Sequence, residues 1–229
     1  KIKTKKNTKL YLKKNKINFN NINSKLAIDC GRVICQTDTD INKTKKLKGG
    51  GIELAKKIVT YKITNECINV IKKLVSLFKP ENTYILSKCG LLVQQATVVM
   101  FGRCNFYKRT GILPSNVIFC TERSGGILKD LTFINLSKPK NKWLSVNTKD
   151  DKSMCGFSKY KYNGALVASK PVGKGIVAKY FKLTHVIDDR EECLKSFFSE
   201  GFLNKNLITF PSLTHNIILK IDIGSNFNL

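Results

Sequence analysis

The sequence predicts an α/β fold in which helices flank a mainly parallel sheet. Short apolar runs end in turns, segments with apolar residues at helical spacing follow them, and the two kinds of segment alternate along much of the 229 residues. Such alternation is typical of βαβ units, which join parallel strands. The length suits one domain with an insertion. No apolar run reaches the roughly 18 residues of a membrane-spanning helix.

The first elements can be placed in order along the chain. Residues 1–24 form a basic, Lys- and Asn-rich arm that we expect to be disordered, and residues 25–229 form the domain. The run KLAIDCGRVI, 25–34, predicts a buried strand and a turn, and the polar run 37–51 predicts a loop. Apolar spacing predicts one helix from about residue 52 to residue 78, where KPEN stops it. The glycines at 49–51 lack a following Lys-Ser/Thr and are therefore no P-loop.

Further strand and helix segments complete the pattern. Strands are expected at 83–90, 116–120 and 183–189, and helices at 91–104, 174–182 and 190–200. Residues 124–170 interrupt the alternation as a Lys-rich insertion, in which GGILKDLTFINLS and GALVAS are candidate strands. The tail, 206–229, predicts one or two more strands.

The net charge of +25 favours attraction to anionic or phosphorylated ligands. It is weaker support for nucleic-acid recognition, because only five of the 41 basic residues are Arg, whose planar fork suits bases and phosphates. The excess Lys also accompanies Asn and Ile, as codon bias in an AT-rich genome would produce. Nucleic acid is therefore a weakly supported partner.

Cysteine usage predicts an intracellular protein. The eight cysteines are scattered, with no CxxC pair and no zinc-ligand spacing, and several lie inside apolar runs. This pattern is typical of buried reduced thiols. The basic arm has no apolar stretch of signal-peptide length. We expect a cytoplasmic location, with a nuclear one left open.

Polar residues stand at the carboxyl ends of three predicted strands, where ligands bind in parallel α/β sheets. They are Asp29, the pair Ser87-Lys88, and the pair Asp188-Asp189. Each also has an ordinary structural interpretation, since Asp often caps helices and a serine can simply end a strand. Two carboxylates on different strands, with a hydroxyl and an ammonium nearby, nevertheless form a coherent candidate site.

These motifs, together with Lys174 fourteen residues before Asp188, resemble those of the haloacid dehalogenase-like hydrolase superfamily. The blocks AIDCGRVI, YILSKCG, FCTER and THVIDDREE fall within residues 25–35, 83–123 and 174–198. The resemblance implies a Rossmann-like three-layer α/β/α sandwich. Because only about 50 residues separate the first two motifs, any cap over the site is expected to be minimal.

The resemblance also implies a Mg²⁺-dependent phosphatase that forms an aspartyl-phosphate. Asp29 would attack phosphorus, Ser87 would bind a phosphate oxygen, and Lys174 would balance the charge, with Lys88 as the competing cation. The Mg²⁺ ligands would be Asp29, the carbonyl of Gly31, Asp188 and Asp189, with Asp189 preferred over its neighbour. The substrate would be a phosphorylated small molecule or macromolecule. The oligomeric state is not predicted.

One departure from the superfamily pattern concerns the general acid. Members usually carry a second aspartate two residues after the nucleophile, and here Gly31 stands at that position. Asp38 or Asp40 could replace it if their loop folds back over the site. The alternative hypothesis is a catalytically weak or inactive domain that serves as a binding module, for example for RNA.

Overall fold

We analysed a computed structural model, which describes residues 24–35, 50–122, 124–135, 164–168, 170–203 and 207–209. Most of the predicted basic arm, the middle of the insertion and most of the tail lie outside these residues. The same holds for Asp38, Asp40 and the rest of the segment 36–49, on which the predicted cap and the substitute acid depend.

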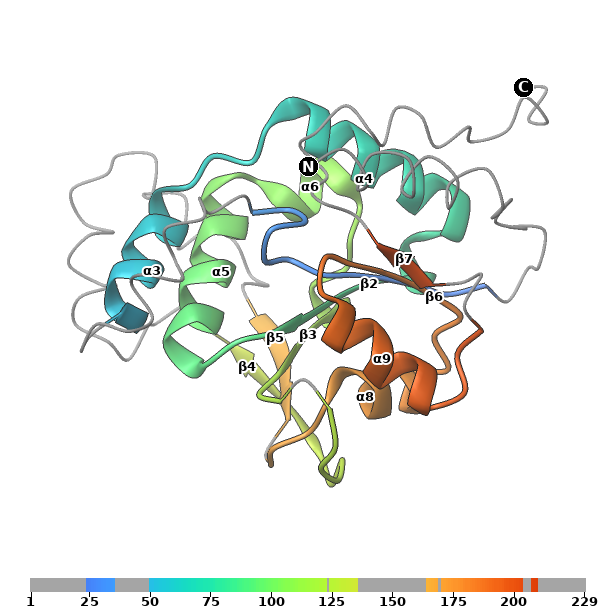
Figure 1. The fold of residues 1–229 in the computed structure, drawn as a ribbon. Coiled ribbons are helices and arrows are strands. Elements are labelled where there is room, and N and C mark those ends of the chain that lie inside the picture. Colours follow the sequence, from blue (N-terminus) through green and yellow to red (C-terminus); the bar gives the residue numbers. More distant parts are fainter. Residues whose placement is uncertain are drawn as a thin grey trace, which may run out of the picture.

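Within the described residues, seven strands form one sheet in the order β4-β5-β3-β2-β1-β6-β7 (Figure 1). Every neighbouring pair is parallel except β4 with β5, so the predicted mainly parallel sheet is confirmed. The strands are β1 (Leu26–Ile28), β2 (Thr83–Lys88), β3 (Val117–Cys120), β4 (Leu131–Asn135), β5 (Gly164–Ala168), β6 (His185–Asp188) and β7 (Leu207–Thr209).

Helices cover both faces of this sheet and give the three layers of a Rossmann-like fold. They are α3 (Gly50–Thr60), α4 (Asn65–Phe78), α5 (Leu91–Arg103), α6 (Phe106–Thr110), α8 (Lys174–Tyr180) and α9 (Glu191–Ser199). Short 3-10 helices η1 (Pro80–Asn82) and η2 (Pro114–Asn116) precede β2 and β3. In Figure 1, α4 and α6 lie on one side of the sheet and α8 and α9 on the other.

The two cores follow from the alternation of side chains along each strand. On β1, Leu26 and Ile28 pack into the core shared with α3 to α6, whereas Ala27 faces the core shared with α8 and α9. The near-continuous apolar runs seen in the sequence are thus explained, because the central strands are buried on both faces.

The single helix expected over 52–78 is wrong, because the chain forms two helices, α3 and α4, with a break at 61–64. Thr64 caps the second helix by accepting a hydrogen bond from the N–H of Cys67 at 3.2 Å. The apolar spacing continues through the break because Ile63 is itself buried in the core. The short helix α6 was not predicted either.

The strands expected inside the insertion are present as β4 and β5. They form an antiparallel pair, and β5 joins β3 in parallel, so both extend the main sheet. Among the described helices, none is both long enough and apolar enough to cross a membrane.

Candidate functional site

Asp29 directly follows the central strand β1 and is buried. Its N–H donates to the carbonyl of Ile187 at 2.9 Å, which continues the pairing of β1 with β6 by one residue. Ile28 lies opposite Ile187 in the register, so Asp29 falls level with Asp188. The parallel register therefore brings together two carboxylates that are 159 positions apart in sequence.

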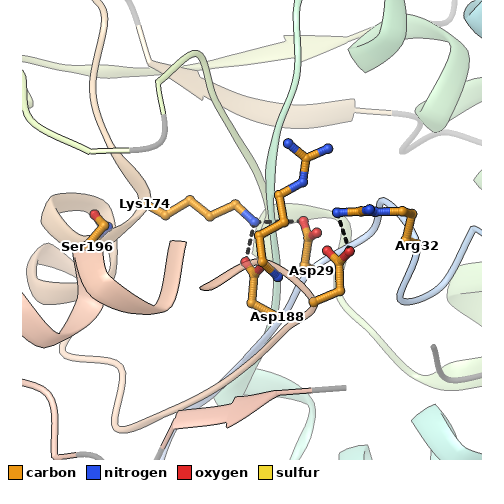
Figure 2. A network of polar contacts seen from close by, with 8 residues as sticks. Asp29, Arg32, Lys174, Asp188 and Ser196 are labelled. Atoms are coloured by element: carbon orange, nitrogen blue, oxygen red, sulfur yellow. Dashed lines mark hydrogen bonds and ion pairs between the residues drawn. The ribbon is translucent and has the colours of Figure 1, made fainter. Parts of the chain in front are cut away.

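Lys174 joins these two carboxylates from the first residue of α8 (Figure 2). Its Nζ lies 2.8 Å from Oδ1 of Asp29 as an ion pair and donates a hydrogen bond of 2.6 Å to Oδ2 of Asp188. Burial alone would lower the pKa of Lys174, but the charges of Asp29 and Asp188 outweigh it and raise that pKa above its ordinary value. Lys174 is therefore positively charged at neutral pH.

Two glycines flank Lys174 and leave no room for side chains. A Cβ on Gly173 would lie 2.5 Å from the Cα of Ser124, and one on Gly175 would lie 2.2 Å from the carbonyl oxygen of Ser196. Gly175 also donates its N–H to the Ser196 hydroxyl at 3.2 Å. The start of α8 is thus clamped between α9 and the segment after β3, which fixes where the lysine enters the site.

The two aspartates at the end of β6, Asp188 and Asp189, make different contacts. Oδ1 of Asp188 accepts the N–H of Arg190 at 2.9 Å, so this aspartate also orders the turn before α9. The N-cap of α9 is Arg190, with no side-chain capping bond, so the interpretation of the acidic pair as a helix cap is wrong. Its pKa is raised by burial and by the charge of Asp29, although Lys174 opposes the shift. Burial, followed by the charge of Asp29, raises the pKa of Asp189 to about 6, against a lowering effect of Arg32.

Arg32 is the residue of this site that the sequence analysis missed. Its guanidinium lies 2.6 Å from Oδ2 of Asp189, while Oδ1 of Asp189 is buried without a hydrogen-bond partner among the described residues. The signal was available, since Arg32 is one of only five arginines and stands three residues after Asp29. Because arginine binds carboxylates well, an arginine so close to a candidate site aspartate could have been expected to pair with an acidic residue of the site.

Asp29, Asp188 and Asp189 could hold a metal ion together. One carboxylate oxygen from each lies within 4.8 Å of the other two. Oxygen ligands of this kind suit Mg²⁺, which binds few carboxylates and keeps several waters. The buried, unpartnered Oδ1 of Asp189 supports the fit, because such an atom is costly unless something binds it.

The remaining predicted residues are less closely associated with this cluster. Ser87 is buried on β2, the neighbour of β1, but its hydroxyl makes no hydrogen bond to the described residues. Lys88 is exposed, and it is Lys174 that contacts the carboxylates. Gly31 lies beside Asp29, since a Cβ there would be 4.0 Å from Oδ2 of Asp29.

Three thiols lie near the charged groups, two of them buried (Cys120 and Cys193) and one partly exposed (Cys89). Burial raises the pKa of Cys120 to about 12 and that of Cys193 to about 11, and it raises the pKa of Cys89 as well. These thiols are therefore neutral and add no charge beside the aspartates. The seven described cysteines are free, as predicted, and Cys155 lies outside the described residues.

Comparisons with protein-family models, with curated proteins and with solved structures found no match. The resemblance to the haloacid dehalogenase-like superfamily therefore remains a prediction from the sequence motifs. The structure itself shows an α/β fold with a mainly parallel sheet and a buried group of three aspartates.

Proposed function

We propose that the chain is a Mg²⁺-dependent phosphohydrolase of the haloacid dehalogenase type. The observation that carries the proposal is the buried contact of Asp29 with Lys174, beside two further carboxylates at the carboxyl edge of the sheet. An ammonium fixed beside a buried carboxylate offsets its charge and holds it in one position, as attack by a carboxylate nucleophile requires.

The reaction we assign begins with Asp29. Lys174 holds Oδ1, so Oδ2 is the oxygen left to attack phosphorus. The new bond joins Oδ2 to phosphorus, the bond to the leaving oxygen breaks, and that oxygen takes a proton from water. Water then attacks the phosphorus of the aspartyl-phosphate, which releases inorganic phosphate and regenerates the carboxylate of Asp29.

Asp29, Asp188 and Asp189 are the side chains that would hold Mg²⁺. The ion, when bound, would neutralise charge on the phosphate oxygens and orient the group for in-line attack. Lys174 would keep the acidic cluster from repelling a dianionic phosphate. Ser87 would be a phosphate contact only if its hydroxyl turns toward the group bound at Asp29.

The glycine at position 31 narrows the expected substrates. No described acid stands where the superfamily places its proton donor, and general acid catalysis contributes about 10²–10⁴-fold in rate. We therefore expect turnover to depend strongly on the leaving group, with phosphates of acidic alcohols or phenols, or acyl phosphates, hydrolysed fastest.

The test is a phosphatase assay with p-nitrophenyl phosphate, with and without Mg²⁺, on the unaltered protein and on Asp29→Asn. The matched control is Asp130→Asn, which removes the same charge from an exposed aspartate directly before β4, an edge strand of the sheet. Metal-dependent turnover that survives in Asp130→Asn and disappears in Asp29→Asn supports the proposal. Equal activity in the two variants would exclude Asp29 as the nucleophile.

The second candidate is a binding module without turnover, and the glycine at position 31 is the observation that favours it. The net charge of +25 would then attract an anionic partner such as RNA. Under this function, p-nitrophenyl phosphate is not hydrolysed with any metal, and RNA binding weakens steeply as salt is raised.

A further inference from the structure

Two cations contact the acidic cluster, and they differ in their access to water. Lys174 and Arg32 approach the aspartates from opposite sides (Figure 2). The side chain of Lys174 is 2% exposed, whereas that of Arg32 is 45% exposed. Moving Lys174 away would strand a buried ammonium, but Arg32 can leave its partner and be solvated at once.

Of the two carboxylate oxygens of Asp189, the partner of Arg32, only one has a partner among the described residues. Arg32 lies 2.6 Å from Oδ2, and Oδ1 is buried with no hydrogen-bond partner in the described part of the chain. An unsatisfied buried acceptor is costly, because it has lost its water without gaining another partner. A divalent cation at Asp189 would satisfy this carboxylate better than the guanidinium does, and it would compete with the guanidinium for the same negative charge.

Hydrogen bonds hold the backbone of Arg32, whereas its side chain is partly exposed to water. Arg32 has φ 64°, a left-handed conformation that non-glycine residues rarely adopt. Its N–H donates to the carbonyl of Cys35 at 2.8 Å, and Gly31 forms a bridge with Cys35. This turn therefore places the side chain of Arg32 beside the acidic cluster, within reach of an ion or ligand bound there.

We propose that Arg32 is an exchangeable counter-ion: it pairs with Asp189 until a divalent cation binds, and its guanidinium then takes an oxygen of the bound phosphate. This inference rests on the proposed function and adds a residue for which that function did not account. The guanidinium fork matches a phosphate as well as it matches a carboxylate, so the same side chain can serve both partners.

The exchange predicts opposite effects of one substitution. Arg32→Ala removes a competitor of the metal, so affinity for Mn²⁺ alone should rise roughly three- to tenfold. The same change removes a contact to the anion, so affinity of the Mn²⁺-loaded protein for inorganic phosphate should fall about tenfold. A residue that served only to stabilise the turn would not move the two affinities in opposite directions.

The experiment measures both affinities, with free Mn²⁺ followed by electron paramagnetic resonance and phosphate binding followed by calorimetry. The control is Lys182→Ala, which also removes an exposed positive charge at a left-handed position, φ 54°, at the far end of α8 from Lys174. Arg32→Lys keeps the charge without the fork, and it should restore metal affinity more fully than phosphate affinity.

The inference is overturned if Arg32→Ala leaves either affinity unchanged, or if it changes both affinities in the same direction. It is also overturned if Lys182→Ala changes the two affinities in the same way as Arg32→Ala does. It is also overturned if neither the unaltered protein nor any variant binds Mn²⁺. Turnover decides the proposed function separately. If the enzyme is active but Arg32→Ala does not move the two affinities in opposite directions, the proposed function stands without this role for Arg32. If the affinities move in opposite directions but no turnover is found, the role of Arg32 stands without the proposed function.

Discussion

The ammonium of Lys174 lies 2.8 Å from Oδ1 of Asp29, although the two residues come from different elements of the fold. Asp29 follows the central strand, and Lys174 begins a helix packed on one face of the sheet. Because both are almost fully buried, each is the main means of stabilising the other's charge.

Replacing Lys174 with Met should destabilise the protein strongly. The change leaves Asp29 and Asp188 buried beside each other without their cation, and breaking such a pair costs about 3–5 kcal/mol. Lys179→Met on the same helix is the control, because that side chain is 67% exposed and its ion pair with Glu200 is worth less than about 1 kcal/mol. Urea denaturation measures both, and equal losses would contradict a buried, charged Lys174.

The metal-free protein should lose stability as the pH rises through about 6. The pKa of Asp189 is about 6 in the folded chain, above its ordinary value of 3.8, so the folded state binds more protons between these values. This contribution is fully present below about pH 4 and is lost as the pH rises through about 6.

The measurement is the free energy of unfolding of the unaltered protein minus that of Asp189→Asn, in chelator, from pH 4.5 to 7.5. Subtracting the variant removes the titration of the other carboxylates. The difference should decrease with rising pH and become flat above about pH 7. A difference that does not change with pH would contradict the raised pKa.

Gly31→Asp should restore a proton donor. A Cβ at position 31 would lie 4.0 Å from Oδ2 of Asp29, which is ordinary contact, so the new side chain fits beside the proposed nucleophile. Turnover of alkyl phosphates should rise by about 10²-fold, with little change for p-nitrophenyl phosphate, whose leaving group needs no acid. Gly31→Asn has the same shape without the proton, and an equal gain in that variant would rule out acid catalysis.

Mg²⁺ should stabilise the fold through the three aspartates. At a free concentration of about 100 times its dissociation constant, a ligand that binds only the folded state adds about 2.7 kcal/mol. Thermal unfolding with Mg²⁺ and with chelator measures the shift, which Asp189→Asn should reduce and Asp130→Asn should keep. A shift of the same size in Asp189→Asn would place the metal elsewhere.

The location of the cluster could be predicted because parallel sheets impose it. Asp29 and Asp188 each stand at the end of an apolar run, and parallel neighbours place such ends side by side. Lys174 was found through motif spacing, and the structure gives the physical reason, since α8 leads directly into β6. The positions of strand ends and the order of elements follow from the topology of the sheet, and both can be recognised in the sequence.

The contacts that could not be predicted depend on local backbone geometry. Arg32 reaches Asp189 only because a non-glycine residue adopts φ 64°, which sequence patterns disfavour. The helix break before Thr64 was hidden because Ile63 is buried and continues the apolar spacing. The antiparallel edge strand β4 was expected as a strand, but its partner and direction depend on how the insertion returns to the sheet.

The glycines on either side of Lys174 have a consequence for how mutational data on this protein will be interpreted. Any side chain at position 173 or 175 collides with backbone atoms, so both positions should tolerate substitution as poorly as Lys174 itself. A scan of all single substitutions would therefore mark three consecutive positions as essential, although only the middle one carries a functional group. Intolerance at this segment measures how tightly the lysine is held. Stability measurements on purified variants are needed to distinguish loss of folding from loss of catalytic function.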